Sequence, residues 1–367
     1  MGATENKIKV TIIAGGTGGH VMPALAVARH LKQLGHQVHW LGTRAGIEAR
    51  LVPQENIPLS FIDIQGLRGK KAYILLFAPF KILKAIVQSY RVLAKERPNA
   101  VLCMGGYVSG PGAIAAWVLR CPIVLHEQNA VAGWTNRVLA NFASSIMVAF
   151  PNAFRGRKTT NIVETGNPVR QDILNVLPPV ERLGSRQSQV RVLILGGSQG
   201  ATKLNEVIPK AFALLPVEQR PLVWHQTGKN NLEITKRAYE DCEVKAQVSD
   251  FIQDMKEAYS WADMVICRSG ALTTAEICAV GLPSILIPFP FAVDDHQTFN
   301  AQHLSERGAA LLIKQSALTP QDLSELLLDL IKHPEKRLAM AIASHALAKP
   351  LATTIVAEQC LEVSCES

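Results

Sequence analysis

The sequence predicts an α/β protein built from two tandem Rossmann-like domains. Apolar, β-branched runs alternate with helical patterns along the whole chain, which is typical of parallel sheets covered on both faces. A strand, a glycine turn and a helix start follow one another twice, at Val10–Gly19 and at Arg191–Gly200. Each copy opens its own series of strands, so the repeat indicates two doubly wound halves rather than a short solenoid.

The expected elements fall into two series. Strands of the first domain are expected at Val10–Ala14, Val38–Leu41, Ala100–Met104, Ile123–Leu125 and Ile146–Ala149. Those of the second are expected at Val190–Leu195, Leu222–Gln226, Met264–Cys267 and Ser284–Pro288. Helical patterns lie between the strands, among them Ala24–Leu34, Val131–Phe142 and Gln321–Ile331.

A segment rich in Pro, Gly and polar residues, 165–189, is expected to link the domains. We therefore place the first domain at residues 1–168 and the second at 169–348. Residues 349–367 are expected to form a helix that returns to the first domain.

Composition excludes several classes of protein. Of the chain's 367 residues, 48% are hydrophobic and 19% are charged. This is close to the composition of globular proteins and differs from that of disordered or collagen-like chains. Its seven cysteines form no CxxC pair and are expected to be reduced thiols. The longest apolar run, Ala72–Phe80, is too short to span a bilayer, and the first residues contain no apolar signal core. We expect a protein that is neither exported nor membrane-spanning.

Charge is distributed unevenly along the chain. Residues 1–165 contain 19 Lys and Arg against 7 Asp and Glu, a net charge of +12. Residues 166–367 contain 19 against 23, a net charge of −4. The basic half suits a membrane surface, a phosphate-bearing ligand or nucleic acid, or is simply a basic solvated surface.

The first glycine turn, Gly15–His20, directly follows a predicted strand. Glycines let backbone N–H groups approach an anion at a helix start. Because Val21 breaks the GxGxxG spacing and no GK[ST] follows, the turn fits neither a dinucleotide fingerprint nor a P-loop. The alternative is a tight turn with no ligand.

Two further turns in the second domain point to a nucleotide. Gly196–Gly200 repeats the glycine device, with Ser198 adding a hydroxyl donor. The stretch Cys267–Glu276 follows a strand and opens a helix, so Glu276 could bind the two hydroxyls of a ribose. The alternative is a helix with capping hydroxyls and an ordinary surface glutamate.

Polar residues also follow two strands of the basic half. Gly105–Gly110 and His126–Asn129 are expected at the carboxyl edge of the sheet, where ligands of such folds bind. A zinc protease is excluded because HExxH would need His where Ala130 stands, and Asp294–Gln297 has no further ligand in register. No metal site is expected.

Residues 68–91 combine apolar and basic side chains. After Pro79, an apolar face carries Phe80, Leu83, Ile86, Val87 and Tyr90, while Lys81, Lys84, Gln88 and Arg91 lie on another. The segment is either a core helix with a solvated face or an element that enters an anionic leaflet.

Several of these motifs together resemble a known family. GGTGGHVMPALA, MGGYVSGPG, VLHEQNAVAG, TGNPVR, GGSQGA, CRSGALTTAE and DDHQTFNA match, in order, the MurG family, the undecaprenyldiphospho-muramoylpentapeptide β-N-acetylglucosaminyltransferases. The resemblance implies a GT-B fold with donor and acceptor meeting in the interdomain cleft. It implies a UDP-N-acetylglucosamine-dependent hexosyltransferase that adds N-acetylglucosamine to the muramoyl 4-hydroxyl of lipid I and gives lipid II for peptidoglycan.

The resemblance also implies a place in the cell. It suggests peripheral attachment to anionic phospholipid at the cytoplasmic face of the bacterial inner membrane, and a role in cell-wall biogenesis, cell shape, cell cycle and cell division. Other cell-wall synthesis proteins are implied as partners, and nucleic acid is not.

The resemblance assigns two sets of ligand residues. Those implied for UDP-N-acetylglucosamine are Thr17, Gly18, Gly19, Asn129, Arg170, Ser198, Ile252, Ala271, Leu272, Thr273, Thr274, Ala275, Glu276 and Gln297. Those implied for the acceptor are Gly105, Gly106 and Tyr107. The sequence departs from the family at Thr298, a position that is often aromatic, which makes the contacts beside Gln297 uncertain.

The residues themselves suggest the chemistry. A nucleoside diphosphate leaving group needs its developing charge compensated, and helix amino termini can do this without a metal or another cofactor at the donor site. Inversion needs a single base for the acceptor hydroxyl. His20 is the first choice, since a neutral imidazole accepts a proton near pH 7, and Glu127 is the rival. His20 could instead only bind the acceptor diphosphate.

Three other functions compete with that of a glycosyltransferase, and each is less consistent with the sequence. A nicotinamide-dependent oxidoreductase needs the GxGxxG fingerprint that both turns lack. A UDP-sugar 2-epimerase can share the fold but needs neither a lipid-facing patch nor a basic half. A non-catalytic nucleotide-sugar-binding protein would lack base candidates, whereas His20 and Glu127 are both present.

Overall fold

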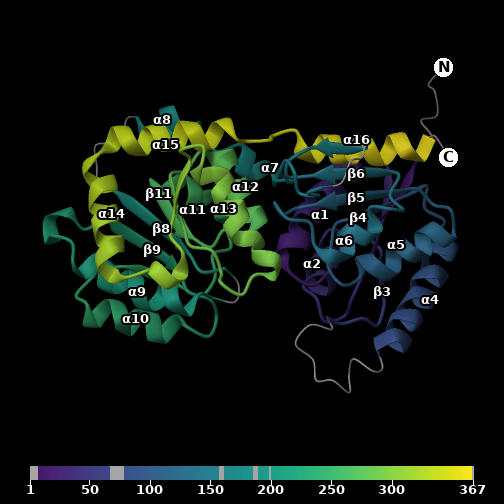
Figure 1. Ribbon diagram of the computed structural model, residues 1–367, viewed down its shortest axis with the longest axis horizontal. Coiled ribbons are helices and arrows are strands. Elements are labelled where there is room, and N and C mark those ends of the chain that lie inside the picture. The colour runs from purple at the N-terminus through teal and green to yellow at the C-terminus, as the bar shows by residue number, and fades with distance from the viewer. Residues whose placement is uncertain (1–6, 67–77, 157–160, 185–188, 198–199, 366–367) are drawn as a thin grey trace. The chain divides into compact units, whose positions relative to one another are not determined.

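A computed structural model describes residues 7–66, 78–156, 161–184, 189–197 and 200–365 (Figure 1). The chain divides into two compact units. The first comprises Met1–Arg170 with Lys349–Ser367, and the second comprises Gln171–Ala348. Among the described helices, none is long and apolar enough to cross a membrane.

The first unit contains a parallel sheet in the order β3-β2-β1-β4-β5-β6-β7. Its strands are β1 Lys9–Ile13, β2 Gln37–Gly42, β3 Leu59–Phe61, β4 Ala100–Cys103, β5 Ile123–Glu127, β6 Ser145–Val148 and β7 Ile162–Glu164. Its helices are α1 Gly18–Gln33, α2 Glu48–Gln54, α4 Ala78–Glu96, α5 Ser109–Val118, α6 Trp134–Leu139 and α16 Ala352–Cys365. The strand order reverses between β1 and β4, where ligands of such sheets bind.

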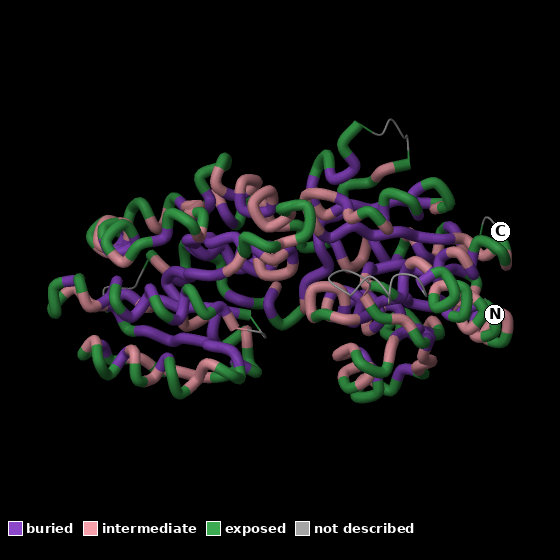
Figure 2. The backbone as a smooth tube through the Cα atoms, turned by 60° about the horizontal axis from the view of Figure 1, so that its bottom comes forward, coloured by how far each residue is buried: buried purple, intermediate pink, exposed green. Residues whose placement is uncertain are grey.

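Helices cover both faces of this sheet, because successive side chains of a strand point to opposite faces. Ile12 packs with α1, α2 and α16 in one core cluster, whereas its neighbour Ile13 packs with α4, α5 and α6 in the other. The strands β1, β2, β4, β5 and β6 are buried along most of their length, whereas the edge strands β3 and β7 are half-buried to exposed (Figure 2). The last helix, α16, belongs to this unit because Val356 and Cys360 pack on α1 and on the central strands.

The second unit repeats the strand order, as β10-β9-β8-β11-β12-β13. Its strands are β8 Arg191–Leu195, β9 Leu222–Gln226, β10 Gln247–Ser249, β11 Met264–Cys267, β12 Ser284–Leu286 and β13 Ala310–Leu312. Its helices are α7 Gln171–Leu174, α8 Pro179–Leu183, α9 Thr202–Ala213, α10 Leu232–Asp241, α11 Met255–Trp261, α12 Ala271–Val280, α13 His296–Ser305, α14 Pro320–Lys332 and α15 Pro334–Ala346. The reversal here lies between β8 and β11, so both glycine turns of the repeat stand at equivalent places.

Three sequence expectations about elements are wrong in part. The helix expected at Val131–Phe142 is only α6, because the Ala132 N–H bonds to the Ala153 carbonyl and the extended Gly133 caps the helix. The first helix starts at Gly18 rather than Ala24. The linker is partly built into the second unit, since the buried Arg182 donates hydrogen bonds to the carbonyls of Ala262, Val280 and Gly281.

Candidate functional site

Two glycine turns of the first unit meet where its strand order reverses. A Cβ on Gly106 would lie 2.2 Å from the Gly15 carbonyl oxygen, and one on Gly105 would lie 2.5 Å from His20 Nδ1. Both glycines have positive φ, at +97° for Gly105 and +84° for Gly106. The turns predicted from the sequence are therefore in direct contact, and side chains larger than hydrogen would separate them.

Helix α1 begins within the first turn. Thr17 is its N-cap in an extended conformation (φ −107°, ψ 162°), and the Thr17 side chain makes no capping hydrogen bond. The helix runs for 16 residues from Gly18, so its dipole and its first N–H groups favour an anion beside Gly18 and Gly19. This is the device expected from the glycine pattern.

His20 is held by two neighbours at the carboxyl edge of the sheet. Its Nδ1 lies 3.1 Å from the Met104 carbonyl oxygen and 3.2 Å from Gln128 Oε1. The Gln128 amide in turn donates to the Met104 carbonyl at 2.7 Å. Gln128 belongs to the predicted polar quartet, yet no motif in the sequence distinguishes it from its neighbours.

Glu127 is buried and accepts hydrogen bonds at both carboxylate oxygens. Oε1 accepts from the backbone and side-chain amides of Asn129, and Oε2 accepts from the Gly133 N–H and from the Asn136 amide at 2.7 Å. The carboxylate thus orders the loop that carries Asn129. Both oxygens of Glu127 are thus engaged by groups of its own loop and of α6.

A second buried glutamate supports the first glycine turn. Glu48 accepts hydrogen bonds from the Gly16 N–H at 3.0 Å and from the Thr43 N–H and hydroxyl at 2.8 and 2.7 Å. Glu48 lies 32 residues from Gly16 in sequence, and no motif connects them. Sequence reasoning missed it for that reason.

The remaining predicted residues of this unit occupy different settings. Tyr107 is mostly exposed beside the second turn, and Arg170 is half-buried. His126, next to Glu127, is buried, and burial lowers the pKa of its imidazole to about 4. Its Nε2 donates to the Gly166 carbonyl at 2.9 Å, which makes it a structural residue.

The second unit has its own turn at the carboxyl end of β8. The Gly196 N–H bonds to the Gln226 carbonyl, and a Cβ on Gly200 would lie 2.4 Å from the Thr227 carbonyl oxygen. Helix α9 starts directly after this turn, so N–H groups again converge there. Ser198 lies outside the described residues.

Helix α12 supplies the other side of this candidate site. It begins at Ala271 after an extended Gly270, and the Thr274 hydroxyl donates back to the Ala271 carbonyl. Glu276 is buried, and the Tyr259 hydroxyl donates to its Oε2 at 2.9 Å. The surface-glutamate alternative is therefore wrong, and Tyr259 is a supporting residue that the sequence did not reveal.

Ile252 lies on a loop of the same unit, and Gln297 lies in the first turn of α13. Ile252 is buried, and Gln297 Oε1 accepts the Phe289 N–H at 2.9 Å. Thr298, where the sequence departs from the family, bonds instead to Asp295 Oδ1. Across the described residues, no cluster of three metal-ligating side chains occurs.

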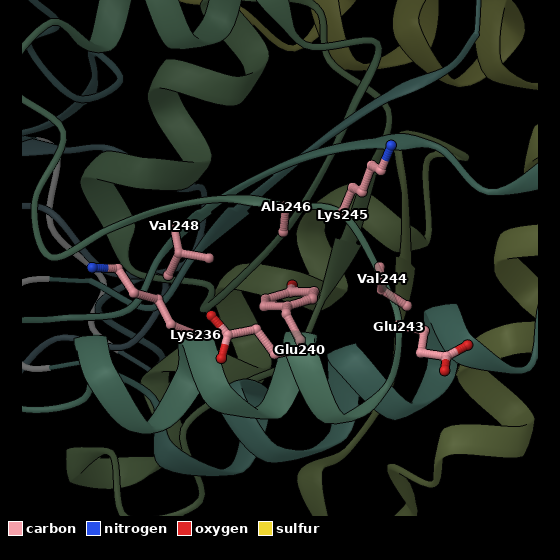
Figure 3. A pocket seen from close by; sticks show the side chains of 8 residues that line it. Lys236, Glu240, Glu243, Val244, Lys245, Ala246 and Val248 are labelled. Carbon is pink, nitrogen blue, oxygen red and sulfur yellow. The ribbon is translucent and has the colours of Figure 1, made fainter.

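A separate pocket of ≈ 640 Å³ lies beside α10 and β10 (Figure 3). Lys236, Glu240, Glu243 and Lys245 line it, so its two positive and two negative groups do not select an anion. None of the predicted ligand residues is among its walls. The donor site is therefore not this pocket.

Each unit thus carries a glycine turn and a helix amino terminus at the reversal point of a doubly wound sheet. This defines a two-domain enzyme class of the Rossmann type that handles phosphate-bearing ligands. The family model of the glycosyltransferase family 28 N-terminal domain matches residues 10–148, and that of the C-terminal domain matches residues 191–355.

Full-length relatives narrow the class. The UDP-N-acetylglucosamine–N-acetylmuramyl-(pentapeptide) pyrophosphoryl-undecaprenol N-acetylglucosamine transferase of Marinobacter nauticus is 52% identical over 353 residues, covering 96% of this chain and 97% of the relative. The crystal structure of MurG from Acinetobacter baumannii superposes with a TM-score of 0.83 at 42% identity, covering 97% and 99% of the two chains. The chain belongs to the MurG family of glycosyltransferases, and the predicted family and GT-B fold class are confirmed.

A UDP-N-acetylglucosamine 2-epimerase structure has the same fold. Its TM-score is 0.69 at 14% identity, covering 99% of this chain and 98% of that one. Identity this low shows the fold alone.

Proposed function

We propose that this protein transfers N-acetylglucosamine from UDP-N-acetylglucosamine to the muramoyl 4-hydroxyl of lipid I, giving lipid II for peptidoglycan. The observation that carries the proposal is the 52% identity, over nearly the full length, to a transferase named for this reaction. That match favours the transferase over the epimerase, which shares only the fold.

The second unit is proposed to hold the donor. Backbone N–H groups at the starts of α9 and α12 would stabilise the diphosphate as its charge develops. Glu276 would accept hydrogen bonds from ribose hydroxyls, with Tyr259 holding its carboxylate in place. Gln297 would contact the transferred sugar.

His20 is proposed as the base. The acceptor oxygen forms a bond to the anomeric carbon while the bond to UDP breaks, the electron pair leaves with UDP, and His20 takes the hydroxyl proton. The four hydrogen bonds to Glu127 support a role for that rival in ordering the loop of Asn129. His20→Ala should lower kcat by about 10²–10⁴-fold with donor KM nearly unchanged. A loss confined to acceptor KM would instead make His20 a diphosphate ligand.

UDP release tests the reaction itself. With UDP-N-acetylglucosamine alone the protein should release almost no UDP, and a soluble short-chain lipid I analogue should start turnover. Conversion of the donor to its 2-epimer without any acceptor would support the epimerase. Binding of the donor with no turnover under either condition would support a non-catalytic protein.

We also propose peripheral attachment to anionic phospholipid at the cytoplasmic face of the inner membrane through α4. Phe80 is 71% exposed and Leu83 is 59% exposed, whereas Ala85 and Leu93 of the same helix are buried. Most of the predicted apolar face is thus exposed rather than packed in the core, which supports the proposal. Lys81 is exposed beside it, and Lys84 pairs with Asp63 at 2.8 Å. Arg68, Lys70 and Lys71 lie outside the described residues.

Vesicle co-sedimentation tests this attachment. Wild type should bind anionic but not zwitterionic vesicles, because shallow apolar insertion and basic charge act together. The double change Phe80→Ser and Leu83→Ser should reduce binding while activity on a soluble acceptor persists. Ile234→Ser is the matched control, since Ile234 is 70% exposed on α10 of the second unit. Wild-type binding by the double variant would refute the role of α4.

A further inference from the structure

We infer that Gln128 is a positioning residue that, with the Met104 carbonyl, holds His20 in the tautomer with hydrogen on Nδ1. The inference rests on the proposed role of His20 as the base. It goes further by assigning which imidazole nitrogen takes the proton from the acceptor and which residue holds the imidazole in the tautomer that leaves this nitrogen free of hydrogen.

The hydrogen on Nδ1 follows from what Nδ1 faces. A backbone carbonyl oxygen can only accept, so the 3.1 Å contact with Met104 requires a donating Nδ1–H. Gln128 Oε1, at 3.2 Å from the same nitrogen, is a second acceptor. A neutral imidazole with hydrogen on Nδ1 keeps its lone pair on Nε2.

The orientation of the Gln128 amide follows from the same carbonyl. Its NH₂ donates to the Met104 oxygen at 2.7 Å, which turns Oε1 rather than the nitrogen toward His20. Gln128 is almost fully buried, and the Asn167 amide bonds to its backbone carbonyl at 3.0 Å. The His20 imidazole, the Gln128 side chain and the Met104 carbonyl thus contact one another, and the Met104 carbonyl fixes the orientation of the other two groups.

Gly105 completes the support of the ring. A side chain there would collide with the imidazole, since its Cβ would lie 2.5 Å from Nδ1 and 2.7 Å from Cε1. The Nδ1 edge of His20 is thus packed and hydrogen-bonded, and Nε2 is the nitrogen left for the acceptor hydroxyl. When Nε2 takes the proton, the bonds from Nδ1–H become charge-assisted and stabilise the cation. Gln128 therefore plays the part of the third group that orients a catalytic base.

Two other buried histidines provide internal references. His126 donates from Nε2 to the Gly166 carbonyl at 2.9 Å. His225 has Nε2 at 3.1 Å from Asn205 Oδ1, and the Asn205 amide donates to the Thr227 carbonyl, so Oδ1 accepts. Both carry hydrogen on Nε2, the tautomer opposite to that of His20.

Long-range ¹H–¹⁵N correlation spectra of histidine-labelled protein test the inference at a pH where the imidazoles are neutral. His20, assigned by loss of its signals in His20→Gln, should show protonated Nδ1 and bare Nε2. His126 and His225 should show the reverse. A bare Nδ1 on His20 in the wild type would overturn the inference without any variant.

Gln128→Met removes the acceptor and the donor with little change of volume. The His20 signals should move toward a mixture of tautomers, and kcat should fall about 10–100-fold at unchanged donor KM. Gln128→Glu keeps an acceptor for Nδ1–H and should retain the tautomer and more of kcat than Gln128→Met. An unchanged tautomer and kcat in Gln128→Met would overturn the role of Gln128.

The two layers of the proposal fail differently. If His20 is not the base, His20→Ala and Gln128→Met both keep wild-type kcat, although Gln128→Met still changes the tautomer. If Gln128→Met does not fold, the wild-type spectrum and Gln128→Glu still decide the matter. The inference would then be contradicted if Gln128→Glu carried hydrogen on Nε2 of His20 and still had the kcat of the wild type.

Discussion

Buried carboxylates beside the glycine turns accept hydrogen bonds from backbone N–H groups. Glu48 accepts from Gly16, and Glu127 accepts from Asn129 and Gly133, so both anions hold loops that carry ligand candidates. The two glutamates thus hold the candidate site of the first unit in place, and Glu276 is the carboxylate proposed to bind a ligand in the second.

Glu276→Ala should weaken donor binding. Charge-assisted hydrogen bonds to ribose hydroxyls contribute about 1.5–3 kcal/mol, so UDP affinity should fall roughly 10–150-fold by calorimetry. Tyr259→Phe removes only the supporting hydroxyl at Oε2 and should give a smaller loss of affinity. Unchanged UDP affinity in a folded Glu276→Ala variant would remove Glu276 from the donor site.

Candidate site residues could be predicted from the sequence where they lie within a short local motif. The glycine turns, His20 and Glu276 lie within short motifs after strands, so the sequence pointed to them. Glu48, Gln128 and Tyr259 act on residues 17 to 108 positions away, and only the fold brings them together. Their roles follow from hydrogen bonds that no spacing in the sequence encodes.

At the scale of elements, the two glycine turns of the first unit are in close backbone contact, with a Cβ on Gly106 only 2.2 Å from the Gly15 carbonyl oxygen. Gly106 has φ +84°, and its Cα faces backbone atoms of Gly15 rather than a movable side chain. A substitution at Gly106 therefore meets two costs, the left-handed backbone and the clash.

Gly106→Ala should lower the free energy of unfolding of the first unit by more than Gly35→Ala does. Gly35 has a similar φ of +87° with nothing within 4 Å of its Cβ, so it reports only the backbone cost of about 1–2 kcal/mol. Urea unfolding of both variants measures the difference. Equal losses would show that the turns are not in rigid contact.

Helices and strands could be predicted where a hydrophobic pattern extends over many residues. The prediction failed where tertiary contacts determine where an element begins or ends. The expected helix Gln321–Ile331 matches α14, and the central strands match within a few residues. The strands β3, β7, β10 and β13, which have three residues each, were missed. Helix α6 is shorter than expected because Glu127 bonds the Gly133 N–H at its start.

Across the whole molecule, each unit holds a buried neutral histidine. Burial lowers the pKa of His126 to about 4 and that of His225 to about 3. As the pH falls below the usual histidine pKa of about 6.5, the unfolded chain gains protons that the folded units do not bind. Stability should therefore be lost progressively as the pH falls toward these lowered values.

Between pH 7 and pH 5, each histidine should lower the free energy of unfolding by about 2 kcal/mol. His126→Gln keeps an amide that can donate to the Gly166 carbonyl but does not titrate. The variant should lose less stability than wild type over this range, and only in the unfolding of the first unit. Urea unfolding at the two pH values measures it, and identical losses in variant and wild type would rule out His126 as the source.

In the proposed reaction, a single displacement occurs at the anomeric carbon, and His20 deprotonates the acceptor hydroxyl. The most direct test of this displacement is the configuration of the new linkage in the product made from UDP-N-acetylglucosamine and a lipid I analogue. The coupling of the anomeric proton in the NMR spectrum of that product reports it. We predict a β linkage throughout, inverted from the α linkage of the donor. An α linkage would contradict a single displacement and the role of His20 in it.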